Sequence, residues 1–441
     1  MFCISSSNLS ILLNGDRLDP FRPSRGIKQG DPLSPYVFIL CMEYLAWLIQ
    51  EEVLSGNWKG IRASRNGPTF THLFLADDLI LFATASLKNY HTIKKVLDTF
   101  CLASSQKINH SKSKIFFSPC TSPRNIEMVE NELGFSSTRD FGNYLGTPIL
   151  IDRRNKRVYN FIIDKLRARL ASWNANSLSF VGRLTLINFV TIALPTHIIQ
   201  CTLLPTKVCK EIDKLNRNFL WGDTTSNKKM HLKNWSIVTL PKAVGGLGIK
   251  RSLPRNKALL ANRAWALRSN NSDPWAITLK CKYPSHLPPT KKLSSTWHSL
   301  TKVNHICNKS TGWSVRDGST INFWIDNWLG LDPLRQVIQG PLYRNKDSLK
   351  IQDVWDANGN WNLGTLSIAS PPHIIDSIIA IPKSSHPQHP DAPFWVSSSN
   401  GIVTSNFAYL LALDPLFPPP ILAGNGFGNY PPSPVSQTSF G

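Results

Sequence analysis

Two adjacent aspartates, Asp77 and Asp78, interrupt an otherwise apolar segment, and they constrain the fold more than any other feature of the sequence. Residues 71–82 read Thr-His-Leu-Phe-Leu-Ala-Asp-Asp-Leu-Ile-Leu-Phe. Apolar runs on both sides predict a buried β-hairpin whose turn carries the two carboxylates. Two buried like charges repel each other unless a cation neutralises them, and Mg²⁺ prefers carboxylate oxygens. Taken alone, an ordinary hairpin with an Asp-Asp turn has the same sequence.

The charge of the chain indicates a polyanionic partner. The 441 residues include 49 Lys and Arg against 28 Asp and Glu, which gives a formal net charge of +21. Such an excess favours nucleic acid, although a merely basic protein has the same composition. In residues 151–270 the helical patterns place cations beside apolar stripes, for example Lys207, Lys210, Lys214 and Arg217.

The sequence has no feature of an exported or membrane-spanning chain. Its amino end lacks the basic-then-apolar order of a signal peptide. The longest apolar run, residues 36–49, contains Glu43 and is too short to cross a bilayer. The eight cysteines are scattered, without a CxxC pair or zinc-binding spacing. We therefore expect an intracellular protein, in the nucleus or cytoplasm, without a membrane partner.

A second motif lies upstream of the aspartates. Residues 25–35 read Arg-Gly-Ile-Lys-Gln-Gly-Asp-Pro-Leu-Ser-Pro and precede an apolar helical stretch. Ser34 and Pro35 are predicted to be the N-cap and the first residue of that helix. Gly26 and Gly30 would allow the backbone to approach a ligand closely.

Together, these motifs resemble those of reverse transcriptases. Residues 25–35 resemble the RGxxQGDPLSP stretch, and residues 75–78 resemble the (F/Y)xDD box, with leucine in place of the usual aromatic residue. Farther along, residues 104–113 resemble the SGLxIN–KS motif, with Ser105 in place of its usual glycine. Residues 144–148 resemble the YLGxP element at the primer grip. The order of the whole set is specific to this family.

The resemblance extends to plant LINE-type (non-LTR) retrotransposon enzymes and covers nearly all of residues 3–411. Beyond the primer grip, the matching segments are Trp173, residues 179–183, 219–222 and 241–249 in the thumb region, residues 313–328 in the next segment, and residues 394–409 in the lead-in to a zinc-binding module.

This resemblance implies an RNA-directed DNA polymerase, a nucleotidyltransferase that uses Mg²⁺ (Mn²⁺ as a substitute) and takes an RNA template, a DNA primer and deoxynucleoside triphosphates as partners. Asp77 would be the metal ligand and Asp78 its catalytic neighbour. The implied substrate-binding residues are Arg25, Gln29 and Gly30 at the template and nucleotide pocket, Lys112 near the incoming triphosphate, and Tyr144, Leu145 and Gly146 at the primer end. A solvated Lys112 and a loop-bracing Gln29 are the alternatives.

The predicted fold class is α+β, in four segments. Residues 1–150 would form a partial reverse-transcriptase palm, and residues 151–270 a basic helical thumb. Residues 271–411 would form a small, Trp-rich and β-rich extension that leads to a truncated zinc-binding module. Residues 412–441 contain many Pro, Gly, Ser and Asn and no Lys or Arg, a composition that predicts a disordered tail.

The palm of this family needs a third carboxylate, on a strand upstream of the RGxxQGDPLSP stretch. Residues 3–14 match the segment that follows that strand, and Asp16 and Asp19 lie in a turn-like context. We therefore expect a chain that is truncated at both ends and catalytically incomplete by itself. Two hypotheses stay open: a reverse transcriptase domain that is inactive alone, and a non-catalytic nucleic-acid-binding remnant of a retroelement.

Overall fold

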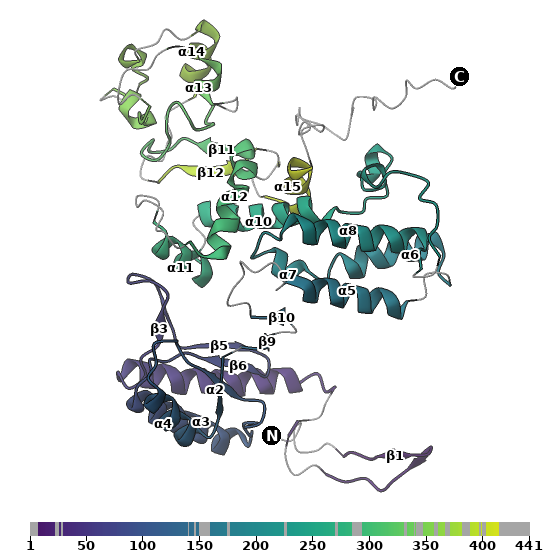
Figure 1. Cartoon of the computed structure of the whole chain (residues 1–441). Coiled ribbons are helices and arrows are strands. Elements are labelled where there is room, and N and C mark those ends of the chain that lie inside the picture. The colour runs from purple at the N-terminus through teal and green to yellow at the C-terminus, as the bar shows by residue number, and fades with distance from the viewer. Residues whose placement is uncertain are drawn as a thin grey trace. The chain divides into compact units, whose positions relative to one another are not determined.

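The chain divides into two compact units in the computed structural model (Figure 1). The first unit comprises residues 1–151 with 277–285, and the second comprises residues 152–276 with 286–441. The structure describes residues 8–22, 26–27, 30–139, 141–144, 147–149, 159–173, 177–224, 227–269, 272–284, 293–329, 333–338, 340, 347–356, 360–366, 371–381, 389–396, 398 and 403–413.

The first unit combines three long helices with short two-stranded sheets. Its elements are β1 (Leu12–Leu13), β2 (Asp16–Arg17), α2 (Ser34–Leu54), β3 (Ile61–Arg62), β4 (Thr69–Phe70), β5 (His72–Leu75), β6 (Asp78–Leu81), α3 (Leu87–Ser104), β7 (Lys114–Phe116), α4 (Pro123–Leu133), β8 (Ser136–Thr138), β9 (Asn143–Tyr144) and β10 (Thr147–Pro148). Strands β7 and β8 pair in parallel, and the other pairs are antiparallel hairpins.

The core of the first unit lies between α2, α3 and α4. Helix α3 begins where the Ser86 hydroxyl accepts a hydrogen bond from the Asn89 backbone nitrogen. Its buried residues recur at helical spacing, and they pack with Leu45 and Ile49 of α2 and Val129 of α4. The β5–β6 hairpin, which carries the acidic pair at its turn, packs against this helical layer.

The second unit is mainly helical. Its elements are α5 (Asn160–Ser172), α6 (Phe180–Leu186), the π-helix η2 (Ile187–Thr191), α7 (Thr196–Ile199), α8 (Thr206–Trp221), α9 (Trp235–Val238), η3 (Lys242–Val244), α10 (Ser252–Arg268), α12 (Ser295–Ser310), β11 (Thr311–Ser314), α13 (Leu334–Val337), η4 (Ile351–Val354), η5 (Leu363–Thr365), α14 (Pro372–Ile379), β12 (Ala392–Trp395) and α15 (Ser405–Ala412). Helix α11 (Pro274–Lys282) spans the boundary between the units.

Helix α8 is the central helix of the early part of the second unit. Val208, Ile212 and Phe219 are buried, as their spacing predicts, and α8 packs against α5, α6 and α10. The helix ends at Gly222, whose φ of 77° is the left-handed C-cap conformation that favours glycine. The opposite, charged side of α8 is therefore left at the surface.

The prediction of an α+β fold is confirmed, but the prediction of a β-rich extension is wrong. The described part of residues 271–411 consists mostly of helices, with one strand pair between β11 and β12. The reason is visible at Phe323 and Trp324, which are adjacent and both buried, whereas strand neighbours point to opposite faces. The Asn322 side chain accepts hydrogen bonds from the backbone nitrogens of Trp324 and Ile325, so this segment is a turn.

Two further boundaries differ from the sequence-based prediction. Helix α2 has Leu33 as N-cap and Ser34 as its first residue, because the Asp31 carboxylate and carbonyl already accept from the nitrogens of Leu33 and Ser34. At the other end, α15 continues to Ala412 and Leu413 is buried, so the predicted tail does not start at 412. Residues 414–441 of that predicted tail lie outside the described residues. No helix in the described ranges is both long and apolar enough to span a membrane.

Candidate active site

Asp77 and Asp78 lie at the tip of the β5–β6 hairpin, as predicted. Leu75 pairs with Asp78 across the strands, which leaves Ala76 and Asp77 as a two-residue turn. Ala76 has a φ of 51°, the left-handed conformation that such tight hairpin turns require. This conformation is costly for a residue with a Cβ, so the surrounding structure has to hold it.

The two faces of the hairpin have different surroundings, because side chains alternate along a strand. Phe74, Leu79 and Leu81 pack against the helical core of the first unit. Asp78 pairs with Leu75 on the opposite face, where both side chains are exposed, and Asp77 is exposed in the turn. The expectation that the carboxylates are buried is therefore wrong: apolar residues on both sides of an acidic pair can belong to a hairpin with only one buried face.

The base of the hairpin is tied to the core by hydrogen bonds. The indole nitrogen of Trp58, a buried residue, donates to the Phe82 carbonyl oxygen at 3.0 Å. The buried amide of Asn89 accepts from the Lys59 nitrogen at 2.9 Å and donates to the Thr84 carbonyl oxygen at 2.8 Å. These hydrogen bonds involve residues just before the hairpin (Lys59) and just after it (Phe82 and Thr84). They therefore fix the base of the hairpin to the core of the first unit.

The carboxylates of Asp77 and Asp78 are available to a ligand. Neither takes part in a hydrogen bond or an ion pair within the described part of the chain. Adjacent, uncommitted carboxylate oxygens suit a hard divalent cation such as Mg²⁺. Among the described residues, however, no group of three Asp, Glu, His or Cys side chains is placed to hold a metal ion. The pair fits a cation chemically but supplies only part of its coordination sphere.

The glycine-containing motif is only partly described. Gly26 and Gly30 have φ angles of 85° and 84°, and a Cβ added to either would meet nothing within 4 Å. Glycine is therefore needed here for its left-handed conformation, rather than for close approach to another part of this chain. The candidate residues Arg25 and Gln29 lie outside the described residues.

The remaining candidates of the first unit lie on separate turns. Lys112 is exposed in a turn in which Asn109 accepts from the Lys112 nitrogen at 3.2 Å, through both its carbonyl and its side-chain oxygen. Half-buried Tyr144 pairs with Thr147 in the β9–β10 hairpin, whose turn residues Leu145 and Gly146 lie outside the described residues. No hydrogen bond or ion pair in the described ranges joins Lys112 or Tyr144 to the aspartates.

Ser105, the residue found in place of a glycine, occupies a position that favours glycine. It is the C-cap of α3 and has a φ of 57°. Left-handed C-caps are usually glycine, because a Cβ is sterically unfavourable there. The substitution of serine for the usual glycine therefore affects how α3 ends and how stable the first unit is.

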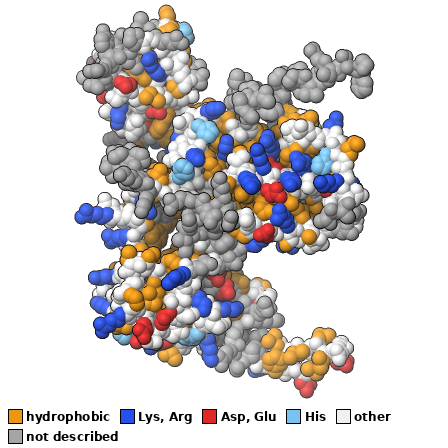
Figure 2. Space-filling model, viewed as in Figure 1, with side chains coloured by type: hydrophobic (Ala, Val, Ile, Leu, Met, Phe, Trp, Pro, Cys, Tyr) orange, Lys and Arg blue, Asp and Glu red, His pale blue; other side chains and the backbone are white. Residues whose placement is uncertain are grey.

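The basic residues singled out on α8 do not form a uniform surface. Lys207, Lys210 and Lys214 are exposed, whereas the Nε atom of Arg217 is buried and its positive charge acts on Asp213. Glu211 partly neutralises the exposed row, since it pairs with Arg167 of α5 at 3.1 Å and with Lys214 at 3.8 Å. Lys and Arg side chains gather around a few acidic ones on the face over α5 and α8 in Figure 2. This basic face, defined by Lys207, Lys210 and Lys214, suits contacts with phosphates.

Sequence patterns did not predict how the distant motifs of the second unit meet. The Arg183 guanidinium donates to the carbonyl oxygens of Leu220 at 2.9 Å and Leu178 at 2.9 Å. It thereby places a cation at the C-terminal end of α8, where the helix dipole is negative. Gly246 is packed against the Leu240 carbonyl so closely that a Cβ would lie 2.1 Å from its oxygen. These motif residues therefore have structural roles.

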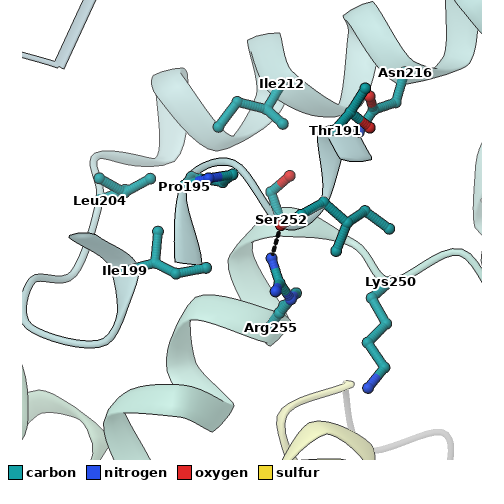
Figure 3. Close-up of a pocket in the computed structure, with 10 residues that line it drawn as sticks. Thr191, Pro195, Ile199, Leu204, Ile212, Asn216, Lys250, Ser252 and Arg255 are labelled. Carbon is teal, nitrogen blue, oxygen red and sulfur yellow. Dashed lines mark hydrogen bonds between the residues drawn. The ribbon is translucent and has the colours of Figure 1, made fainter. Parts of the chain in front are cut away.

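A pocket in the second unit lies between η2, α7, α8 and the start of α10 (Figure 3). The Arg255 guanidinium donates to the Ile192 carbonyl and to the Thr196 hydroxyl, so it is committed to the protein. The pocket volume of about 10 Å³ is that of a single water molecule. The pocket cannot accommodate a nucleotide, and the exposed hairpin tip is the better candidate site.

Comparisons with known proteins bear on both units. Residues 2–149 match the family described as reverse transcriptase (RNA-dependent DNA polymerase). The chain is 33% identical over 227 residues to the "Putative ribonuclease H protein At1g65750" of Arabidopsis thaliana, which covers 50% of this chain and 37% of that protein. It is 37% identical over 113 residues to the "Uncharacterized mitochondrial protein AtMg01250" of the same plant, covering 25% of this chain and 88% of that protein.

A third relative comes from an insect. The "Retrovirus-related Pol polyprotein from type-2 retrotransposable element R2DM" of Drosophila melanogaster is 40% identical over 88 residues, which is 20% of this chain and 8% of that protein. The chain thus spans 37% of the first relative and 8% of the third, and most of the second.

Proposed function

The chain belongs to the reverse transcriptase family of retrotransposons through residues 2–149, and on this basis we propose that the β5–β6 hairpin carries the catalytic carboxylates of an RNA-directed DNA polymerase. Asp77 is the metal ligand in this proposal, and Asp78 is its neighbour at the reacting phosphates. The observation that carries the proposal is the geometry of the hairpin tip, where two exposed, uncommitted carboxylates stand on a packed base.

The chemistry follows from the charges at the tip. Mg²⁺ bound there would neutralise the developing charge on the phosphates and activate the attacking 3′-hydroxyl. Asp77 and Asp78 would orient the cation and keep it at the tip, because their exposed oxygens are not used by other groups of the described chain. Mn²⁺ prefers the same oxygen ligands and should substitute for Mg²⁺.

The proposed partners are an RNA template, a DNA primer and deoxynucleoside triphosphates. We assign the first unit to the palm and helices α5, α6, α8 and α10 to the thumb. The basic face of α8 then contacts phosphates of the template–primer duplex, since it presents three exposed lysines on one side of a helix. Gly30, Lys112 and Tyr144 keep the substrate-binding roles that the family resemblance implies.

A second candidate function is favoured by one observation. The described residues do not place a third ligand beside Asp77 and Asp78. With two carboxylates, the metal would be held weakly and without fixed geometry, and phosphoryl transfer depends on that geometry. The isolated chain would then bind nucleic acid through its basic face without copying it.

Primer extension on an RNA template separates the two functions. The full chain is incubated with a labelled DNA primer annealed to RNA, with Mg²⁺ or Mn²⁺, and binding of the same duplex is measured in parallel. We expect binding without extension by this chain alone, because the described residues do not place a third metal ligand beside Asp77 and Asp78. Extension that is abolished by Asp77→Ala would establish the enzyme and reject the binding-only function. Absence of both binding and extension would contradict both candidates.

A further inference from the structure

The segment Asn227–Lys233 follows α8 and is held at its inner side by one aspartate. Asp223 accepts from the Lys229 backbone nitrogen at 3.0 Å through Oδ1, and its Oδ2 lies 3.2 Å from His231 Nε2. The His231 ring stacks on Trp221, with the ring centroids 5.9 Å apart and an interplanar angle of 19°. The segment is therefore fixed to the end of α8 and is not a freely moving loop.

The outer side of this segment presents apolar side chains between cations. The Lys229 backbone nitrogen and the His231 ring contact Asp223, and the Lys229 side chain is exposed. Met230 and Leu232 are 82% and 70% exposed. Lys228 and Lys233, which flank them, are also exposed, and residues 227–233 contain no acidic residue. Two neighbouring apolar side chains held in water between cations mark a contact surface.

We propose that residues 228–233 form a wedge that enters a groove of a nucleic-acid duplex. Lys228 and Lys233 neutralise phosphates on the two sides of the groove, and Met230 and Leu232 contact the sugars and base edges between them. Lysines beside apolar wedge residues are the side-chain combination that proteins use in the minor groove. The inference deepens the proposed function and rests on it, because it takes the template–primer duplex as the partner.

A duplex fits the segment better than the other polyanions do. Single strands are bound largely by stacking on aromatic rings, and the one ring in the segment, His231, is already stacked on Trp221. The fixed backbone also matters, because a surface that is ordered before binding loses less conformational entropy on binding. Asp223 and Trp221 are thus positioning residues, and the contact residues are Met230 and Leu232.

The test uses the full chain and fluorescence anisotropy with an RNA–DNA hybrid, and with single-stranded RNA of the same length. In the Met230→Ser/Leu232→Ser variant we expect affinity for the hybrid to fall about fivefold to tenfold with an unchanged salt dependence, and affinity for the single strand to change less than twofold. In Lys228→Gln/Lys233→Gln, the slope of log affinity against log salt should become shallower by about 1–2 units. The matched control is Ile325→Ser, which changes an apolar residue that is 58% exposed elsewhere in the second unit.

Four results would overturn the inference. If the Met230→Ser/Leu232→Ser variant binds the hybrid as tightly as the wild type does, the wedge proposal is rejected and the proposed function is unaffected. An equal loss of affinity for the hybrid and for the single strand would show that the segment does not contact a duplex groove. Binding of the wild-type chain to vesicles with an acidic lipid headgroup, lost in the same variant while hybrid binding is kept, would assign the segment to a membrane surface. If the wild-type chain binds no hybrid at all, the proposed function fails together with the inference.

Discussion

Asp213 of α8 caps the N-terminus of α10 through Ser252, the first residue of that helix. Its Oδ1 atom accepts from the Ser252 backbone nitrogen at 2.9 Å and from the Ser252 hydroxyl at 2.6 Å. The N-cap residue of α10, Arg251, makes no side-chain capping hydrogen bond, so the capping carboxylate comes from a different helix. The negative charge also lies at the positive end of the α10 dipole. The contact joins two helices of the proposed thumb.

Replacing Asp213 with Ala should lower the free energy of unfolding by about 1–3 kcal/mol, because the half-buried Ser252 nitrogen loses its acceptor. Asp213→Asn should have a smaller effect, since the amide oxygen still accepts. Chemical denaturation measures both, with Asp164→Ala as control, because the Asp164 side chain is 70% exposed and its distance to Arg167 is 3.8 Å. Equal stability of Asp213→Ala and the control would show that the cap is not needed.

The same carboxyl group should make stability depend on pH. Burial raises the pKa of Asp213, although the Ser252 hydrogen bonds and the charges of Arg251 and Arg217 oppose this shift. A raised folded-state pKa favours the neutral form, so its stabilising contribution is complete below the ordinary pKa of 3.8 and is lost as the pH rises through the folded-state value. The stability of the wild type relative to Asp213→Asn should therefore decline as the pH rises above 3.8. If the stability of the wild type relative to Asp213→Asn instead increases with pH, the pKa of Asp213 is not raised in the folded state.

Ser105→Gly should stabilise the first unit by about 0.5–1 kcal/mol, because the residue at the end of α3 has a left-handed conformation that glycine adopts without strain. Ala103→Gly, two residues earlier in the same helix, should instead destabilise it by about 1 kcal/mol. Thermal unfolding of the two variants gives shifts of opposite sign. A lower Tm for Ser105→Gly would show that the Ser105 side chain contributes more than its strained backbone costs.

The basic face of α8 should contribute to the salt dependence of duplex binding. Replacing Lys207, Lys210 and Lys214 with Gln should make the log–log slope shallower by about two units, since each phosphate contact accounts for roughly 0.9 and Lys214 also interacts with Glu211. Arg217→Gln should leave the slope unchanged, because the Arg217 Nε atom is buried and its charge acts on Asp213. Anisotropy titrations at several salt concentrations measure both. An unchanged slope in the triple variant would mean that other cations contact the duplex.

Local sequence patterns predicted the features that depend on local spacing. Apolar runs on both sides of Asp77 and Asp78 predicted the hairpin, and helical spacing predicted the buried side of α8. The burial of the aspartates was predicted incorrectly, because a pattern of apolar residues does not reveal which hairpin face is covered. The Asp213–Ser252 and Arg183–Leu220 contacts join residues 39 and 37 positions apart, and no local spacing encodes such pairs.

The central claim is that the carboxylates at the tip of the β5–β6 hairpin bind the catalytic cation, and Mn²⁺ titration of the full chain tests it directly. Electron paramagnetic resonance reports the free ion, so the bound fraction is obtained without any need for polymerase activity. Asp77→Asn/Asp78→Asn should weaken Mn²⁺ binding at least about tenfold, because it removes both anionic ligands. The control Asp98→Asn, an exposed aspartate on α3, should bind Mn²⁺ as the wild type does. Equal Mn²⁺ binding by the wild type and the double variant would contradict the account.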